Sequence, residues 1–125
     1  MSHLPPAVMV HGLAQLQSAC ASAAPFTALS APGAALSWGA LWWQALLAAA
    51  SYTGPALLDC ASAPGRAVEA LELGLSGVIL APCPVWADIA ALAATKNAIL
   101  LPAMPDFLDL GEKRNQRSLM DWLSR

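Results

Sequence analysis

Charged side chains are scarce in this chain of 125 residues, and none occurs before Asp59. They make up 11% of the residues, whereas an average domain has about 25%. The net charge is −2, and a protein without a basic face does not neutralise phosphates, so we expect no nucleic-acid partner. Hydrophobic residues reach 58%, which is the opposite of the composition of disordered chains. The uncharged first half must therefore be buried or covered by a partner.

Cysteine is also rare, with Cys20, Cys60 and Cys83 as the three examples. The number is odd and no two cysteines have CxxC spacing, which argues against a disulfide framework or a zinc ribbon. Reduced thiols are typical of a cytoplasmic protein, and the first residues lack the basic region of a signal peptide. We expect a cytoplasmic location, no metal and no cofactor.

One long uncharged stretch tests whether the chain enters a membrane. Residues 34–52 are nearly all apolar, and a membrane-spanning helix needs about 20 such residues. Gly33 and Gly54 bound the stretch, and no basic cluster flanks it to set an orientation. A buried or interface helix is therefore favoured over a membrane helix, and we expect no membrane partner.

Apolar runs alternate with helical patterns along the chain. The alternation and the short turns predict one α/β domain over residues 1–125, made of about five strand–helix units. The runs are continuous, which is typical of parallel strands that are buried on both faces and covered by helices. The predicted strands are residues 7–10, 26–29, 56–60, 77–80 and 98–101. The predicted helices are residues 13–23, 34–50, 66–73, 85–95 and 113–123.

Two architectures accommodate five such units. One is an open, doubly wound sheet of the flavodoxin-like or Rossmann-like kind. The other is part of a TIM-barrel-like fold, completed by a second chain. Five units are too few for a complete eight-stranded barrel, so the unit count favours the open sheet.

Residues 55–82 carry the features of one strand–helix–strand segment. The run Ala56-Leu57-Leu58-Asp59-Cys60 is followed by a helical pattern ending in Ala70-Leu71-Glu72-Leu73-Gly74, and then by a second apolar run. This segment resembles that of class II aldolases, which are TIM-barrel enzymes. The resemblance implies that Asp59 stands where the family has a proton-transferring aspartate. It also places Cys60 where the family has a zinc-binding histidine, so a zinc site is not implied here.

Several polar residues follow the predicted strands, where ligands bind in parallel α/β folds, and Asp106 is expected at the same edge. An aspartate that ends a buried strand can act as an acid or base, and a thiol at a helix start can act as a nucleophile. Hydroxyl groups and glycines before a helix leave main-chain N–H groups free for an anion. The candidate catalytic residues are Asp59, Cys60 and His11, and the candidate ligand-binding residues are Ser30, Gly33, Ser62, Gly65 and Cys83.

Each of these residues also has a structural interpretation. Asp59 could cap the following loop, the serines could cap helices, and the cysteines could be small core side chains. None of the loops matches a dinucleotide-binding or Walker A pattern. The motif content alone therefore leaves catalysis and binding both open.

Tryptophans crowd the predicted helix of residues 34–50. Together with the neighbouring leucines, Trp38, Trp42 and Trp43 make the apolar surface of this helix wider than the single stripe that packs on a sheet. Aromatic residues are enriched at the centres of interfaces, so these three predict self-association. The alternative is a helix that is buried entirely within the monomer.

Taken together, these patterns favour a homo-oligomeric binding or regulatory protein. Its ligand is expected to be a small anion at the carboxyl ends of the strands. The alternative is a small aldolase-like or lyase-like enzyme that uses Asp59 as acid or base. The residues alone do not decide whether the protein is an enzyme.

Overall fold

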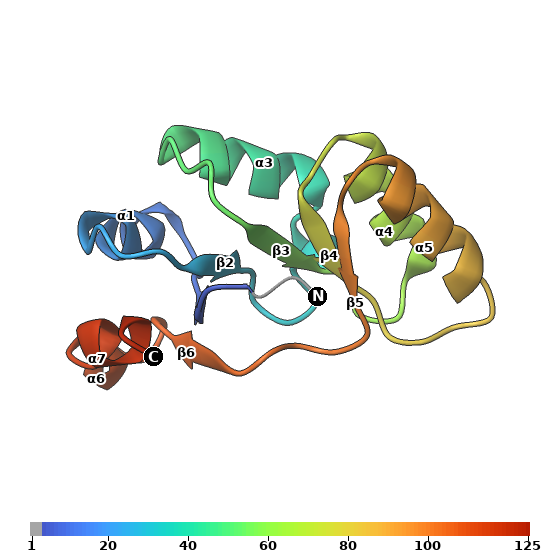
Figure 1. Ribbon diagram of the computed structural model, residues 1–125. Coiled ribbons are helices and arrows are strands. Elements are labelled where there is room, and N and C mark those ends of the chain that lie inside the picture. The colour runs from blue at the N-terminus through green and yellow to red at the C-terminus, as the bar shows by residue number, and fades with distance from the viewer. Residues whose placement is uncertain (1–3) are drawn as a thin grey trace.

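The computed structural model describes residues 4–125, and a parallel β-sheet runs through them (Figure 1). All five strand pairings are parallel, and the order across the sheet is β5-β4-β3-β2-β1-β6. The α/β class and the parallel sheet covered by helices are confirmed. The strands are β1 (Ala7–Met9), β2 (Thr27–Leu29), β3 (Ala56–Asp59), β4 (Gly77–Ile79), β5 (Ile99–Leu101) and β6 (Phe107–Asp109).

Helices cover one face of this sheet. Strands β1 to β5 lie side by side in chain order, and right-handed crossovers in one direction place every connecting helix on the same side. Buried residues of these helices and of the sheet form one continuous hydrophobic core. The helices are α1 (Leu13–Ala21), α2 (Ala34–Ser37), α3 (Ala40–Ala49), α4 (Pro64–Glu72), α5 (Trp86–Thr95), α6 (Lys113–Gln116) and α7 (Leu119–Leu123).

The strand order combines features of the two predicted architectures. A flavodoxin-like sheet reverses direction at a switch point, whereas β1 to β5 follow one another without reversal. Between β5 and β6 the order does reverse, because β6 lies on the other side of β1, so the sheet has a switch point of the open-sheet kind. The consecutive run of β1 to β5 is the feature that it shares with the other predicted architecture, the partial TIM-barrel-like arrangement.

The sheet is strongly curled. Strands β5 and β6 stand at opposite ends of the strand order, yet only residues 102–106 connect them. A flat sheet would separate these edges by about 24 Å, whereas the six steps from Leu101 to Phe107 span at most about 22 Å. The link must also return to the start of a parallel strand. Figure 1 shows this link crossing beneath the sheet, which therefore bends around it.

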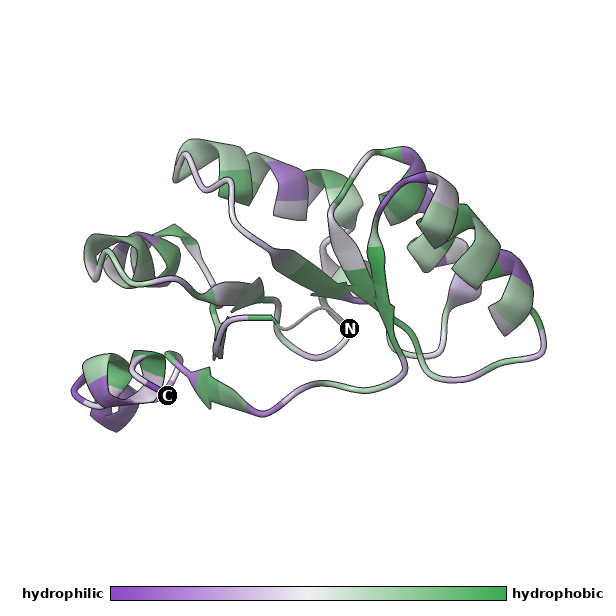
Figure 2. Cartoon of the chain, viewed as in Figure 1, coloured by the Kyte–Doolittle hydropathy of each residue, from purple (hydrophilic) through white to green (hydrophobic). Residues whose placement is uncertain are grey.

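Alternate residues of each strand face two different apolar layers. Val8, Leu58 and Val78 belong to the core under the helices. Met9 and Leu57 belong to a second, smaller cluster, against which Leu4 and Met104 pack. Both faces of β1 to β4 are thus buried, which explains their continuous apolar sequence (Figure 2).

Two predicted helices are divided in the structure. The helix expected over residues 34–50 is broken into α2 and α3 at Gly39, whose φ of 86° suits glycine but not other residues. The helix expected over residues 113–123 is divided into α6 and α7. No helix within residues 4–125 has both the length and the hydrophobicity to span a membrane.

Strand β6 was absent from the sequence prediction. It pairs with β1 and places Leu108 beside Val8. Its three residues follow the proline-containing link closely and are too few to form a recognisable apolar run. Residues 4–125 therefore form six strands in place of the five expected.

Candidate functional site

The carboxyl ends of all six strands lie at one edge of the sheet because every strand runs in the same direction. We call this edge the rim. His11 follows β1, Ser30 follows β2, and Asp59 ends β3. The predicted residues therefore do share one edge, where ligands bind in parallel α/β folds.

The carboxylate of Asp59 is held by main-chain groups. Its Oδ2 accepts a hydrogen bond from the N–H of Gly33 at 2.6 Å, and its Oδ1 accepts one from the N–H of Ala61 at 3.3 Å. Both donors have left-handed backbones, with φ of 69° at Gly33 and 51° at Ala61. The side chain is buried, with 7% of Asp59 exposed. Asp59 thus braces the two loops that follow β2 and β3.

The hydrogen bonds to Asp59 occupy the groups of Ser30 and Gly33 that were expected to bind an anion. The Ser30 hydroxyl accepts a hydrogen bond from the N–H of Asp59 at 2.9 Å and donates one to the carbonyl of Ala31 at 3.2 Å. The N–H of Gly33, which could have bound a ligand anion, already donates to the carboxylate of Asp59. A ligand anion would have to displace Asp59 to bind there.

The other predicted loop is open to solvent. Ser62 and Gly65 are exposed at the start of α4, which begins at Pro64. This end of the helix offers main-chain N–H groups to solvent. Of the two predicted loops, only this one leaves its predicted residues accessible.

Cys60 is unsuited to the catalytic role that was expected of it. It points into the core under the helices and has no exposed surface. Burial, with a smaller contribution from the charge of Asp59, raises the pKa of the Cys60 thiol to about 12. A protonated thiol without solvent access is not a nucleophile, so that prediction is wrong. Cys83 is half-buried and packs against the same core.

His11 forms an ion pair across two neighbouring strands at the rim. Its Nε2 lies 2.7 Å from Oδ1 of Asp109, and the N–H of Gly111 donates to the same oxygen at 2.8 Å. The two side chains are 38% and 28% exposed. A carboxylate only accepts hydrogen bonds, so Nε2 carries the proton and Nδ1 is left for another partner.

The local backbone fixes this pair. Strands β1 and β6 are neighbours, and their register places Met9 opposite Asp109. A Cβ at Gly111 would come within 2.7 Å of the His11 ring, so only glycine leaves room for the imidazole. The main-chain N–H of His11 also donates to Oε1 of Gln15 at 2.8 Å. These contacts hold the ring in one orientation.

Asp109 was missed by sequence reasoning, which considered Asp106 at the rim. The signal that could have found it is the Leu108-Asp109 pair, since an apolar residue followed by aspartate also ends β3, as Leu58-Asp59. Asp106 instead precedes β6 and lies at the opposite edge of the sheet. The prediction of Asp106 at the rim is therefore wrong.

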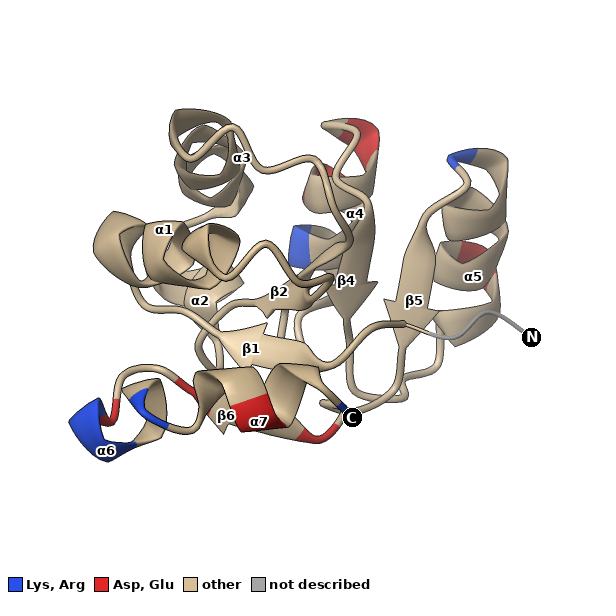
Figure 3. Cartoon of the chain, turned by 60° about the vertical axis from the view of Figure 1, so that its left-hand side comes forward, with Lys and Arg blue, Asp and Glu red and all other residues tan. Residues whose placement is uncertain are grey.

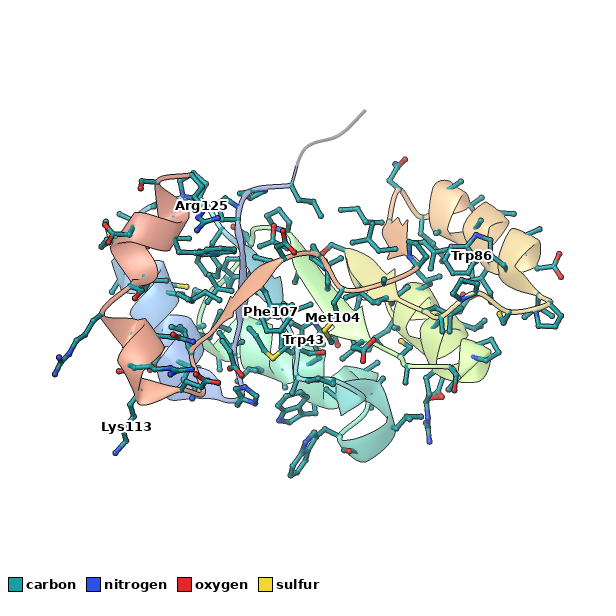
Figure 4. All side chains as sticks on the ribbon, turned by 90° about the horizontal axis from the view of Figure 1, so that it is seen from below. Trp43, Trp86, Met104, Phe107, Lys113 and Arg125 are labelled. Atoms are coloured by element: carbon teal, nitrogen blue, oxygen red, sulfur yellow. The ribbon has the colours of Figure 1, made fainter. Side chains whose placement is uncertain are left out.

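The tryptophans divide between core and surface. Trp43 has no exposed area, and Trp42 packs partly buried against the core. Trp38 is 66% exposed, beside exposed Leu36 and Leu41. Figure 4 shows Trp43 inside the molecule. The expected interface role is wrong for Trp43, which is a core residue, and stays a prediction for Trp38 and Trp42.

No protein-family model, curated protein or solved structure matches the chain. Residues 4–125 also contain no group of three or more histidine, cysteine, aspartate or glutamate side chains that could hold a metal ion. The resemblance of residues 55–82 to class II aldolases stays a prediction. The chemistry of the site therefore has to be argued from the geometry of its own residues.

Proposed function

We propose that the protein is a homo-oligomeric binding protein whose small anionic ligand is held at the rim by His11. The observation that carries this proposal is the contact between His11 and Asp109, in which Asp109 fixes Nε2–H and leaves Nδ1 available. A carboxylic acid can give its proton to Nδ1 and bind as a carboxylate. The imidazolium formed in this way keeps Asp109 as its counter-ion.

The aldolase-like alternative has less support. It requires the Asp59 carboxylate to move protons on a substrate, whereas both oxygens of that carboxylate accept main-chain hydrogen bonds. A general base has to come within hydrogen-bonding distance of the proton that it removes. With 7% of the residue exposed, Asp59 is better suited to holding the rim loops than to meeting a substrate.

A paired set of small molecules tests the ligand proposal. Pyruvate, succinate and benzoate are titrated into the protein beside pyruvamide, succinamide and benzamide, with NMR shifts of the backbone amides as the readout. At least one carboxylate is expected to shift the signals of Gly111 and Gln15, and its amide is not.

The matched variants are His11→Gln and His3→Gln, which each remove one of the two histidines of the sequence. Losing a charge-assisted hydrogen bond should weaken binding roughly tenfold or more in His11→Gln. His3→Gln should bind as the parent does. Rim signals that stay fixed with every carboxylate, or shifts that persist in His11→Gln, would contradict the proposal.

The proposed self-association rests on an exposed apolar patch whose own helices carry no charge. Helices α1, α2 and α3 lie in the half of the chain that has no charged side chain, and Figure 3 shows no charge on them. Leu36, Trp38 and Leu41 are exposed there. Glu69 and Glu72 of α4 border the patch beside Trp38 and Leu41. In a symmetric dimer each surface meets its own copy, so we expect the contact to centre on α2 and α3, which carry no like charges to repel each other. Exposed apolar residues of this kind favour such a contact.

Trp38→Glu is expected to convert the oligomer into a folded monomer, because each copy would bring a buried, unpaired carboxylate into the contact. Light scattering with size-exclusion chromatography measures the mass, and circular dichroism checks the fold. The control is Val85→Glu, which changes another exposed apolar residue, beside α5. A parent protein that is monomeric at high concentration would rule out this part of the proposal.

A further inference from the structure

A hollow lies at the edge of the sheet opposite the rim, where β1 and β6 begin. Its volume is about 310 Å³, and its walls include Pro5, Pro6, Pro105 and Trp122. An adjoining hollow shares Pro105 and Trp122 and extends along the link to β6. Figure 4 shows this side, with Met104 on the link, Phe107 at the start of β6 and Arg125 beyond α7. The volume is within the range of small-molecule sites, about 300–1,000 Å³.

The walls of this hollow are fixed by hydrogen bonds within the protein. The indole Nε1–H of Trp122 donates to the carbonyl of Ala7 at 2.8 Å. Thr27 donates through Oγ1 to the carbonyl of Pro5 at 2.8 Å and through its N–H to that of Pro6 at 2.9 Å. Prolines have no N–H group of their own. The walls are therefore already shaped, and their polar groups already have partners.

Two side chains of opposite charge in the lining of the hollow are left without an ion-pair partner among residues 4–125. Asp106 and Arg125 both line the two hollows. Within residues 4–125 neither forms an ion pair, with the other or with any further side chain. The guanidinium of Arg125 lies 4.4 Å from the centre of the Trp122 ring, a stacking contact that holds it beside the hollow. The hollow thus offers the Asp106 carboxylate to a cationic group and the Arg125 guanidinium to an anionic group, beside apolar walls.

We infer that this hollow binds a small zwitterion with an apolar body, of the class of α-amino acids with aliphatic side chains. The ligand ammonium group donates to Asp106, its carboxylate accepts from Arg125, and its aliphatic part packs against Trp122 and the prolines. The inference is independent of the proposed rim ligand, because the two sites lie at opposite ends of the strands and share no residue.

Three probes of the same shape test the inference. L-leucine carries both charges, 4-methylpentanoate carries the carboxylate alone, and 3-methylbutylamine carries the ammonium group alone. The readout is the NMR signal of the Trp122 indole N–H, assigned with Trp122→Phe. L-leucine is expected to shift this signal and to bind roughly tenfold or more tightly than either single-charge probe, since each of those lacks one charge-assisted contact.

The variants Asp106→Asn and Arg125→Gln should each weaken L-leucine binding to the level of a single-charge probe. Both residues are exposed, so the fold should survive the changes. The control is Asp121→Asn, an exposed change on α7 that is not part of the hollow and should leave binding unchanged. Equal binding of the three probes, an unmoved Trp122 signal, or full L-leucine affinity in both variants would overturn the inference.

Discussion

Trp43→Ala is expected to lower the free energy of unfolding by about 3–5 kcal/mol, the range for removing a large aromatic side chain from a core. The same change at Trp38 is expected to lower it by less than about 1 kcal/mol. The two residues stand five positions apart, but Trp43 has no exposed surface and Trp38 is 66% exposed. The pair therefore separates the core from the surface of one helical segment.

Urea unfolding at low protein concentration, where self-association is weakest, measures both changes. Trp43→Phe is a useful third variant, because the indole Nε1–H of Trp43 has no hydrogen-bond acceptor within residues 4–125. Phenylalanine removes that buried donor while keeping an aromatic ring, so its effect should be smaller than that of alanine. Equal losses at Trp38 and Trp43 would show that the division into core and surface is wrong.

Asp59→Asn is expected to destabilise the protein by about 2–3 kcal/mol. The amide has one oxygen and one NH₂ group, so it can face only one of the two N–H donors, those of Gly33 and Ala61, without placing donor against donor. Leaving a buried donor unpaired costs about 1–3 kcal/mol, and the charge-assisted character of the remaining bond is also lost.

Denaturant unfolding of Asp59→Asn, beside the exposed substitution Asp88→Asn on α5, measures this effect. Asp88→Asn is expected to change stability by less than about 0.5 kcal/mol. If Asp59→Asn is as stable as the parent, the carboxylate does not brace the loops. The acid–base role of Asp59 in the aldolase-like alternative would then be the better explanation of its position.

Much of the fold could be predicted because burial leaves a clear pattern in the sequence. Five of the six strands are continuous apolar runs, and a run buried on both faces can be recognised without knowing its neighbours. The order of the strands leaves no such pattern. The curl of the sheet follows from the short link of residues 102–106, and it can be deduced only when β6 is known to lie beside β1.

The break at Gly39 shows a different limit. The apolar composition of residues 34–50 predicts one helix, and composition does not report the φ of 86° that ends α2. Glycine within a helical pattern is tolerated at a modest energetic cost, so its presence alone did not indicate a break. The break turns Trp38 outward, whereas Trp43 points to the sheet.

The sequence predicted the edge of the sheet at which the candidate site lies, but not which of its side chains contact one another. His11, Ser30 and Asp59 are where parallel strands were expected to place them. The partner of His11 is Asp109, 98 residues away in the chain, and no local pattern joins them. The alternation of strand side chains could have excluded Cys60, which points to the same side as buried Leu58.

The protonation of the His11 ring tests the central claim most directly. Nitrogen-15 NMR of the two histidines, with His11 assigned by its loss in His11→Gln, reports which ring nitrogen carries the proton. The contact with Asp109 predicts that neutral His11 is protonated at Nε2 and bare at Nδ1, and that Asp109→Asn weakens this preference. A neutral ring protonated at Nδ1, or one unaffected by Asp109→Asn, would contradict the proposed ligand site.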